Sequence, residues 1–403
     1  MNKPTASKHM DDPRPSGVVI THIETIPVGG LAFVRVHTSD GISGLGEMHP
    51  ASSASGGRYI PAAAIRFHEE YLVGKDPTHI ERHWQHMFRR SLFRGGADSM
   101  AAISAIDMAL WDITGKLAGL PVYQLLGGPT REMVKLFVTP TCYGTYSPEE
   151  MAESAQRLVA DGFSVLRMYP LGSRETFAKM GFRTVARTAE KYVSAVREAV
   201  GDDIDIAIDV ICLLSPPEAI EMGRLLEPYG LYFFEDPIEP DNAEAMAHVS
   251  SQLPMPVATG ERLCTIHQFR DLLSRNAAAF LRPDLALAGG ITNVRKIAAM
   301  AEASYVDLMP HNPLSWVNAA ASLHLCAAVH NIAILEHHVQ GNVLDSPFDE
   351  VFIGIPELRD GHLIVPDRPG LGIELNDEAL KNYPPSHGQR QPVIRPDGSL
   401  RDY

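Results

Sequence analysis

The sequence predicts an α/β protein built around a parallel βα barrel, and the first observation behind this prediction is a set of evenly spaced acids. Three short apolar segments each end in a carboxylate at intervals of 26 residues, namely at Asp209, Glu235 and Glu261. An interval of about 25 residues accommodates one strand, one helix and two loops, the repeat of a βα barrel. The second observation is that intervals of 23 to 27 residues continue the series to Asp284, His311 and Glu336. We therefore expect these side chains to meet at the C-terminal ends of neighbouring strands.

Composition limits the classes of partner. The 403 residues carry a formal net charge of −14, which argues against nucleic acid and an anionic membrane as partners. An anionic small molecule stays possible, because a bound cation reverses the local field. The four cysteines form no CxxC pair and are typical of reduced thiols in a cytoplasmic protein. No apolar run reaches membrane-spanning length, and the polar segment 1–17, without the apolar core of a signal peptide, is expected to be disordered.

The next part of the chain predicts an α+β domain over residues 18–130. Apolar and polar residues alternate over 18–47 around a Ser-Asp-Gly turn signal, which predicts an antiparallel meander. Helical spacing follows, most clearly at 99–118, where Gly119 ends the pattern. Strands followed by helices, without alternation of the two, are typical of an α+β domain. The intervening segment 48–59 is rich in Gly, Ser and Ala and is either a mobile lid or a solvated connection.

Strands and helices alternate from residue 131 onward, which predicts a barrel domain over 131–359. Beyond the three strands that close at the evenly spaced acids, strands are expected at 134–139, 164–169, 279–284, 306–310 and 333–335. Amphipathic helices are expected between them, and an insertion of undetermined structure occupies 171–182.

The C-terminal segment departs from the barrel repeat. Short apolar stretches at 361–366 and 370–373 are typical of strands and need a sheet to join, which the N-terminal domain offers. Residues 360–403 are therefore expected to return to that domain.

Several motifs, in this order and spacing, resemble the mandelate racemase type of the enolase superfamily. They are the helical segment MAAISAIDMALWDITGKLAGLPVYQLLGG at 100–128, FFEDP at 233–237, TGER at 259–262, RPD followed by GGIT within 282–292, and PHNP at 310–313. The resemblance implies a (β/α)7β TIM-like barrel under an α+β capping domain, which the N-terminal segment and the C-terminal tail form together. It also implies a homo-oligomer with an even number of subunits.

The three evenly spaced acids are the predicted metal ligands. Like charges held together need a cation, and a ligand set made only of oxygen atoms selects a hard one such as Mg²⁺. Asp209, Glu235 and Glu261 also resemble the Mg²⁺ ligands of the superfamily. The alternative for any single acid is a cap or turn former at a strand end, but three in matching contexts favour metal binding.

His311 is the predicted base, and Asp284, at the end of the neighbouring strand, is its predicted partner. An acid behind a histidine fixes its tautomer and supports the imidazolium that forms after proton transfer. A core or capping histidine is the alternative interpretation. Glu336 resembles the family's acid that donates a hydrogen bond to the substrate carboxylate, a role that needs a raised pKa. Its alternative is a solvent-facing acid, and His337 or His338 could compete for the role.

Two positions depart from the family's patterns. The second strand carries Arg167-Met168-Tyr169 where racemases have Lys-x-Lys, and arginine is a poor base, so two-base racemisation is not expected. Arg167 and Tyr169 either act together as the catalytic base, as an Arg and a Tyr do in mannonate dehydratases, or bind the substrate's carboxylate or hydroxyls. Ile211 stands two residues after Asp209, where related acid-sugar dehydratases carry an acidic histidine. Either His311 acts as base and then acid, or Tyr169 is the acid, or the chain is not a dehydratase of that kind.

The resemblance implies a lyase, a hydro-lyase of the acid-sugar dehydratase kind. Its substrate would be a small carboxylate, and the reaction would begin with Mg²⁺-dependent abstraction of the proton next to the carboxylate. Dehydration of a sugar acid to a 2-keto-3-deoxy acid is the first hypothesis. The alternatives are an epimerase, racemase or cycloisomerase on a similar acid, and a metal-binding relative without dehydratase activity.

Overall fold

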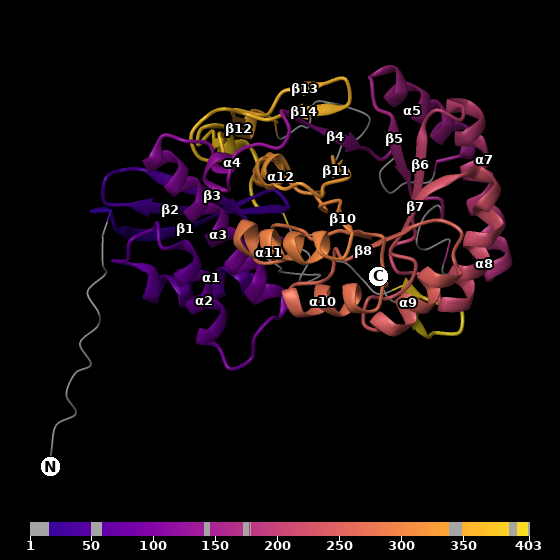
Figure 1. The fold of residues 1–403 in the computed structure, drawn as a ribbon, viewed down its shortest axis with the longest axis horizontal. Coiled ribbons are helices and arrows are strands. Elements are labelled where there is room, and N and C mark those ends of the chain that lie inside the picture. The colour runs from indigo at the N-terminus through magenta and orange to yellow at the C-terminus, as the bar shows by residue number, and fades with distance from the viewer. Residues whose placement is uncertain are drawn as a thin grey trace, which may run out of the picture.

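The computed structural model describes residues 16–49, 59–140, 146–171, 177, 179–337, 349–386 and 393–401, arranged as two domains (Figure 1). The tail predicted to be disordered lies outside the described residues except for its last two. Most of the predicted lid at 48–59 also lies outside the described residues, which include only 48, 49 and 59 of it. Of the predicted insertion at 171–182, residues 172–176 and 178 lie outside them. Within the described residues, no helix is long and apolar enough to span a bilayer.

The N-terminal domain is an antiparallel sheet covered by helices, and the predicted meander is confirmed. Its strands β1 (Ile20–Val28), β2 (Leu31–Thr38) and β3 (Ser43–Glu47) lie side by side in that order. Its helices are α1 (Tyr59–Leu72), α2 (Ile80–Arg90), α3 (Ala97–Ala118) and the short α4 (Val122–Leu125). Strand β3 lies directly against α3, because a Cβ added at Gly44 would fall 2.0 Å from the carbonyl oxygen of Ala109. Glycine is needed at this close approach of strand and helix.

Eight parallel strands form a closed barrel, as the repeat predicted. They are β4 (Met133–Phe137), β5 (Val165–Met168), β6 (Asp205–Asp209), β7 (Leu231–Glu235), β8 (Val257–Thr259), β9 (Phe280–Leu281), β10 (Asp307–Leu308) and β11 (Leu335–Glu336). Strands β5 to β10 pair in chain order, and β11 pairs with β4. Single bridges from Val138 to Leu166 and from Leu308 to Ile332 close the ring between these two sheets.

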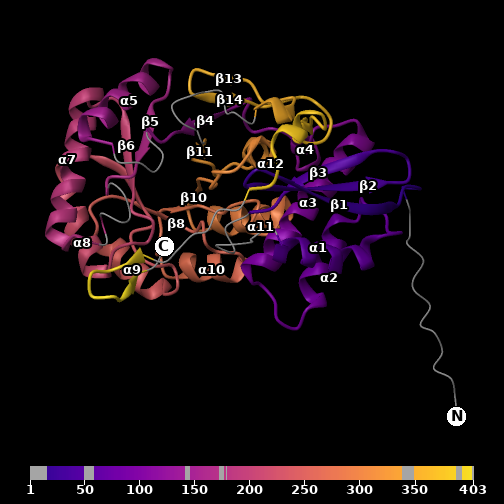
Figure 2. The same ribbon diagram turned by 180° about the vertical axis from the view of Figure 1, so that it is seen from behind.

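Helices surround the barrel on its outer side (Figures 1 and 2). They are α5 (Pro148–Ala160), α7 (Phe182–Val200), α8 (Pro216–Leu226), α9 (Ala243–Gln252), α10 (Ile266–Ser274), α11 (Gly290–Glu302) and α12 (Trp316–Ala328), with 3-10 turns at Glu227–Tyr229, Asp349–Val351 and Ala379–Asn382. Helix α5 begins with a capping box between Ser147 and Glu150, which satisfies backbone N–H groups at its first turn.

A separate apolar cluster fills the inside of the barrel and explains which side chains reach its mouth. Its members are Phe137, Val165, Ala207, Phe233, Ala258, Met309 and Ile334. Side chains alternate between the two faces of a strand, so the residue two positions further on also points inward. Counting two residues on from Val165, Ala207, Phe233, Met309 and Ile334 reaches Arg167, Asp209, Glu235, His311 and Glu336. The packed interior therefore places the predicted site residues in one layer above it.

Two strands end earlier than expected. Strand β8 ends at Thr259, two residues before Glu261, because Gly260 adopts a φ of 128° that interrupts the extended backbone. Strand β9 ends at Leu281, three residues before Asp284, although Asp284 forms an isolated parallel bridge with His311.

The C-terminal segment contacts both domains. The expected pairing of 361–366 with the N-terminal sheet is wrong, because β14 (His362–Ile364) pairs antiparallel with the barrel strand β4 and with β13 (Leu358–Arg359). The neighbouring Leu371 instead reaches the N-terminal domain, where its backbone N–H donates to Asp112 on α3 (2.8 Å). The remaining short strands pair β12 (Phe352–Ile353) with β15 (Glu374–Leu375), and β16 (Val393–Ile394) with β17 (Leu400–Arg401).

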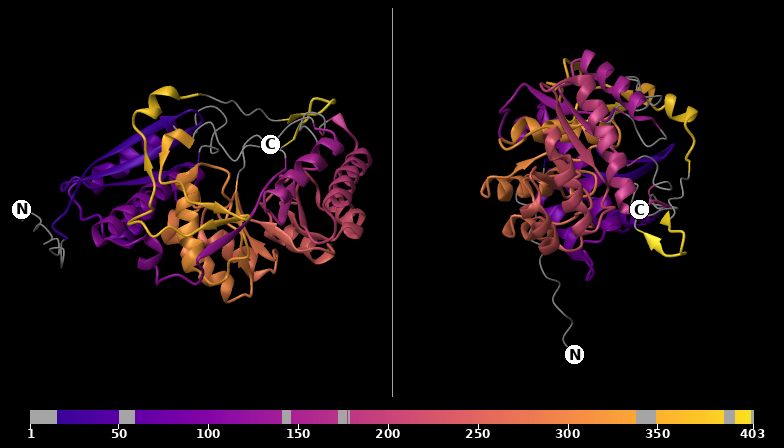
Figure 3. Two further views of the ribbon diagram at one scale, coloured as in Figure 1. Left: turned by 90° about the horizontal axis from the view of Figure 1, so that it is seen from above. Right: turned by 90° about the vertical axis from the view of Figure 1, so that its right-hand side faces the viewer.

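Buried acids join the N-terminal domain to the barrel, which it flanks on one side (Figure 3). Glu47, at the end of β3, accepts hydrogen bonds from Ser315 Oγ (2.6 Å) and the backbone N–H of Asn318 (3.0 Å) at the start of α12. Asp107 on α3 accepts from the backbone N–H of Thr292 on α11 (3.0 Å). These contacts hold the end of β3 at the mouth of the barrel.

Candidate active site

Charged side chains from successive strands converge at the C-terminal mouth of the barrel. The contributing residues are Arg167 after Leu166 in β5, Asp209 in β6, Glu235 in β7, Glu261 after β8, Arg282 and Asp284 after β9, His311 after β10 and Glu336 in β11. The geometry therefore supports the sequence prediction that these five acids and this histidine assemble in one place, although their individual roles stay predictions.

Arg167 lies among the acids and forms ion pairs with three of them. Its Nη1 is 3.3 Å from Asp209 Oδ2 and 3.0 Å from Glu235 Oε1, and its Nη2 is 2.9 Å from Glu336 Oε1. Nη2 also donates to Thr139 Oγ1 at 3.2 Å. A guanidinium held by three carboxylates is strongly favoured in its charged form, so in this arrangement Arg167 acts as a counter-ion.

Arg282 is a second buried cation, and the sequence analysis assigned it no role. Its Nε lies 2.7 Å from Glu235 Oε1 and its Nη2 lies 2.5 Å from Glu336 Oε2, while Nη1 donates to the Met309 carbonyl (3.2 Å). Its position two residues before Asp284 was the available signal, because strand alternation places both on one face. Glu235 and Glu336 thus each pair with two arginines.

Burial changes the acidity of the predicted metal ligands. Burial, together with neighbouring acids, raises the pKa of Asp209 to about 7 and of Glu235 to about 8, against the opposing charge of Arg167. The Oε2 atom of Glu235 is buried and has no hydrogen-bond partner among the described residues. An unsatisfied buried carboxylate oxygen suits a divalent cation, and Asp209, Glu235 and Glu261 offer only oxygen ligands, which fits the chemistry of Mg²⁺.

His311 and Asp284 form a hydrogen-bonded pair, as predicted for a base and its orienting acid. His311 Nδ1 lies 2.8 Å from Asp284 Oδ2, and Asp284 Oδ1 accepts from the backbone N–H of Ala286 (2.7 Å). The other ring nitrogen, Nε2, lies 3.3 Å from Glu261 Oε2. Burial lowers the pKa of His311, but the charges of Glu261, Glu336 and Asp284 outweigh burial and raise it to about 9. Glu261 makes the largest of these contributions, so neutralising its charge would lower the pKa of His311.

Glu336 does not have the raised pKa that was expected of a hydrogen-bond donor to the substrate. Burial raises its pKa, but the charges of Arg167, Arg282 and His311 outweigh burial and hold it well below the usual range. The backbone N–H of Asn312 also donates to Glu336 Oε2 (3.1 Å). These surroundings favour the ionised form of Glu336, and its role toward the substrate carboxylate stays a prediction.

Of the two histidines that follow Glu336, the structure describes only His337. The ring of His337 lies 5.0 Å from that of Trp316, measured between centroids. His338 lies outside the described residues.

Tyr169 follows β5 directly and is buried in the large hydrophobic cluster that contains Leu166 and Met168. Its assignment as an acid or base stays a prediction.

The turn after Asp209 has an unusual backbone. Ile211 and Cys212 both adopt left-handed conformations, with φ of 47° and 59°. A β-branched residue is rarely found there, and such strain tends to occur at functional sites. The backbone N–H of Ile211 donates to Asp209 Oδ1 at 2.7 Å, which helps to fix that carboxylate. Isoleucine offers no proton donor here, and burial raises the pKa of the Cys212 thiol well above its ordinary value.

His49 is a further residue at the mouth that the sequence analysis missed. It follows β3, and its Nε2 lies 3.5 Å from Asp284 Oδ2. Its ring centroid is 6.0 Å from that of His311. One ligand atom each from His49, Asp284 and His311 lie within 4.8 Å of one another. The available signal was its place at the start of the segment 48–59, but no local pattern relates it to Asp284.

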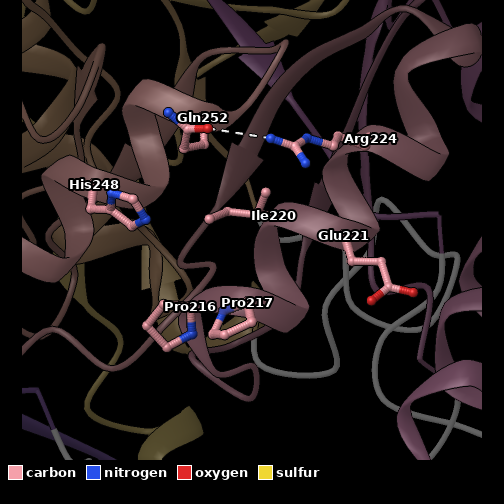
Figure 4. Close-up of a pocket in the computed structure, with 7 residues that line it drawn as sticks. All are labelled: Pro216, Pro217, Ile220, Glu221, Arg224, His248 and Gln252. Carbon is pink, nitrogen blue, oxygen red and sulfur yellow. Dashed lines mark hydrogen bonds between the residues drawn. The ribbon is translucent and has the colours of Figure 1, made fainter.

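A groove on the outside of the barrel, between α8 and α9, carries none of these groups. Its lining includes Ile220 and His248, and a hydrogen bond from Arg224 Nη2 to Gln252 Oε1 (3.3 Å) crosses it (Figure 4). The charged mouth is therefore the stronger candidate for the active site.

Comparison with known proteins matches both domains. Residues 7–127 match the family described as "Mandelate racemase / muconate lactonizing enzyme, N-terminal domain", and residues 150–379 match "Enolase C-terminal domain-like". The chain is 35% identical to a D-galactonate dehydratase of Pectobacterium atrosepticum, over 92% of this chain and 96% of that one. It is 36% identical to a D-galactonate dehydratase of Variovorax paradoxus, over 95% and 100%. The 3,6-anhydro-D-galactonate cycloisomerase of Zobellia galactanivorans has a similar structure, with a TM-score of 0.80 and 31% identity over 91% of this chain and 99% of that one.

Proposed function

The chain belongs to the mandelate racemase / muconate lactonizing enzyme family of the enolase superfamily, and we propose that it is a magnesium-dependent hydro-lyase that removes water from a sugar acid. The observation that carries this proposal is the Asp284–His311 pair, in which the second ring nitrogen, Nε2, lies 3.3 Å from Glu261 Oε2. A base directed at the predicted metal ligands suits abstraction of a proton next to a carboxylate. The relatives named D-galactonate dehydratase support a six-carbon aldonic acid as the first substrate to test.

Asp209, Glu235 and Glu261 would hold the metal ion. When bound, it would stabilise the negative charge that develops on the substrate carboxylate as the neighbouring proton leaves. For this to happen, Arg167 would release at least one of Asp209 and Glu235, with which it now pairs. The released guanidinium would be free to bind a substrate carboxylate or hydroxyl, one of the two roles predicted for it.

His311 would transfer the protons of the reaction. In the neutral imidazole, Nδ1–H donates a hydrogen bond to Asp284 and so leaves the Nε2 lone pair for the substrate. Nε2 takes the proton from the carbon next to the carboxylate, and the C–H electron pair moves into the conjugated carboxylate. Return of those electrons then breaks the neighbouring C–O bond. The same Nε2 proton goes to the departing hydroxyl, which leaves as water, because Ile211 supplies no acid. The enol product tautomerises to a 2-keto-3-deoxy acid.

Isomerisation is the second candidate, and two observations favour it. One is the missing acid at Ile211, and the other is the similarity to a cycloisomerase of an anhydro-sugar acid. Epimerisation would use the same proton abstraction and return a proton to the same carbon, so it has no departing hydroxyl to protonate. Ring opening would also begin with this abstraction, and His311 would protonate the departing ring oxygen.

The test is to incubate the purified chain with Mg²⁺ and a library of aldonic, aldaric and anhydro-aldonic acids, beginning with D-galactonate. We expect a 2-keto acid, detected as its semicarbazone, and its loss when a chelator removes the metal. Conversion of an anhydro-acid, or epimerisation without keto acid, would replace the dehydratase by an isomerase. No conversion of any member would contradict both and favour a metal-binding relative without this activity.

A further inference from the structure

The cluster of His49, Asp284 and His311 has ligand chemistry different from that of the three evenly spaced acids. We propose that it forms a second cation site, which takes Zn²⁺ or a similar borderline divalent ion and not Mg²⁺. The site would use His49 Nε2, Asp284 Oδ2 and His311 Nδ1. Two imidazole nitrogens with one carboxylate suit zinc and its neighbours in the transition series, whereas Mg²⁺ prefers oxygen alone.

The spacing of the three ligand atoms fits a tetrahedral ion. With metal–ligand distances of about 2.0–2.2 Å, two ligands on a tetrahedral zinc lie roughly 3.3–3.6 Å apart. Asp284 Oδ2 lies 2.8 Å from His311 Nδ1 and 3.5 Å from His49 Nε2, and the three atoms fall within 4.8 Å of one another. Widening the Asp284–His311 contact by about 0.5–0.8 Å would bring it to the tetrahedral spacing. Water would take the remaining position.

The surroundings already hold the three side chains in place. The backbone N–H of His49 donates to the Ala286 carbonyl (3.3 Å), and the Ala286 N–H donates to Asp284 Oδ1. The amide of Asn318 also approaches Asp284 Oδ1, at 3.5 Å. Outer contacts of this kind orient metal ligands and raise affinity. Because His49 follows β3 and the other two residues follow β9 and β10, the site joins the two domains.

Occupation of this site would stop the proposed reaction, a consequence that rests on the proposed function. A neutral imidazole carries one proton. If the ion takes the Nδ1 lone pair of His311, that proton must lie on Nε2, and Nε2 then has no lone pair for the substrate proton. Zinc is therefore expected to inhibit at the base, in a way that Mg²⁺ does not relieve.

The binding experiment needs no turnover. Zinc is titrated calorimetrically into the full chain with Mg²⁺ in excess, and we expect one strong zinc site per chain. His49→Gln should weaken zinc binding by at least about tenfold, since loss of a direct ligand should cost no less than loss of an outer contact. Asp209→Asn, which alters only the predicted oxygen site, should leave zinc affinity at the wild-type value.

His248→Gln is the matched control, because it also removes one imidazole, from the exposed surface of α9 at the outer groove (Figure 4). It should bind zinc as the wild type does. Unchanged affinity in His49→Gln, or equal loss in His248→Gln, would overturn the site.

Inhibition is measured separately, as the rate with zinc divided by the rate without it in each protein. The wild type and His248→Gln should lose most of their turnover at a zinc concentration that leaves His49→Gln at most mildly affected. Equal inhibition of His49→Gln would overturn the link between this site and the base. If no compound in the substrate screen is converted, the proposed function is contradicted. The zinc site is still tested, because the calorimetric titration needs no substrate.

Discussion

Two groups of buried acids differ in their partners, although burial raises the pKa in both. At the domain interface, burial raises the pKa of Glu47 to about 8 and of Asp107 to about 7. At the barrel mouth, it raises the pKa of Asp209 to about 7 and of Glu235 to about 8. Burial and a shifted pKa therefore do not by themselves distinguish a structural acid from a functional one.

The partners make the distinction. Glu47 and Asp107 accept hydrogen bonds from backbone N–H groups at the starts of α12 and α11, which move only if a helix moves. Asp209 and Glu235 both pair with the guanidinium of Arg167, which rotation of its side-chain torsions can withdraw. The interface acids are thus built for one arrangement of the chain, whereas the acids at the mouth can exchange one cation for another.

The largest effect is expected from Glu235→Gln. The amide is nearly isosteric but removes one charge from the predicted metal ligands, and metal stabilisation of the developing charge is worth several kcal/mol. Turnover should therefore fall by about 10³-fold or more, with weaker Mg²⁺ binding by calorimetry. Wild-type turnover in this variant would contradict the distinction between the two groups.

Arg167→Met tests whether the guanidinium at the mouth is replaceable. Without metal, the variant leaves buried Asp209 without an ion pair among the described residues and removes one of the two arginines from Glu235 and Glu336. Its free energy of unfolding should therefore fall by about 3–5 kcal/mol in denaturant titrations. Added Mg²⁺ should stabilise the variant more than it stabilises the wild type, because no guanidinium competes for Asp209 and Glu235. Equal stabilisation of the two proteins by Mg²⁺ would show that Arg167 and the metal do not share ligands.

Glu47→Gln tests the interface group. The substitution should lower the free energy of unfolding by about 1–3 kcal/mol by weakening the contacts with Ser315 and Asn318, without changing Mg²⁺ affinity. The substitution should also flatten the dependence of the free energy of unfolding on pH. Folded Glu47 keeps its proton up to about pH 8, while the unfolded group loses it near pH 4.5, so its contribution to stability is largest below pH 4.5 and declines as pH rises to 8. An unchanged slope of stability against pH would contradict this.

The smallest effect is expected from Tyr169→Phe. Tyr169 is buried in the large hydrophobic cluster, so removing only its hydroxyl should reduce turnover by less than about tenfold at constant pH. A general acid or base contributes about 10²–10⁴-fold. A loss in that range, with an unchanged thermal midpoint, would show that Tyr169 is an acid or base. His311 would then act only as the base, and not also as the acid.

The repeat in the sequence predicted the barrel and most of its mouth for a physical reason. Side chains alternate along a strand and functional groups follow its end, so the period alone placed Asp209, Glu235 and His311 together. Glu261 and Asp284 also reach the mouth, although both of their strands end earlier than expected. After β8, Gly260 interrupts the extended backbone.

Other features depend on contacts between distant segments, which no local pattern encodes. His49 meets Asp284 only because β3 lies against α3 and ends at the barrel, and β14 pairs with β4 across more than 200 residues. The lowered pKa of Glu336 follows from two guanidinium groups that reach it from different strands.

The most direct test of the account is solvent exchange at the carbon next to the substrate carboxylate. The substrate found in the screen is incubated in D₂O with Mg²⁺ and either wild type, His311→Asn or the control His248→Gln, and deuterium at that carbon and product formation are followed by NMR. Wild type and His248→Gln should form product, while His311→Asn should show neither product nor exchange above background and should keep its Mg²⁺ affinity. Product or exchange at the wild-type rate in His311→Asn would contradict the assignment of His311 as the base.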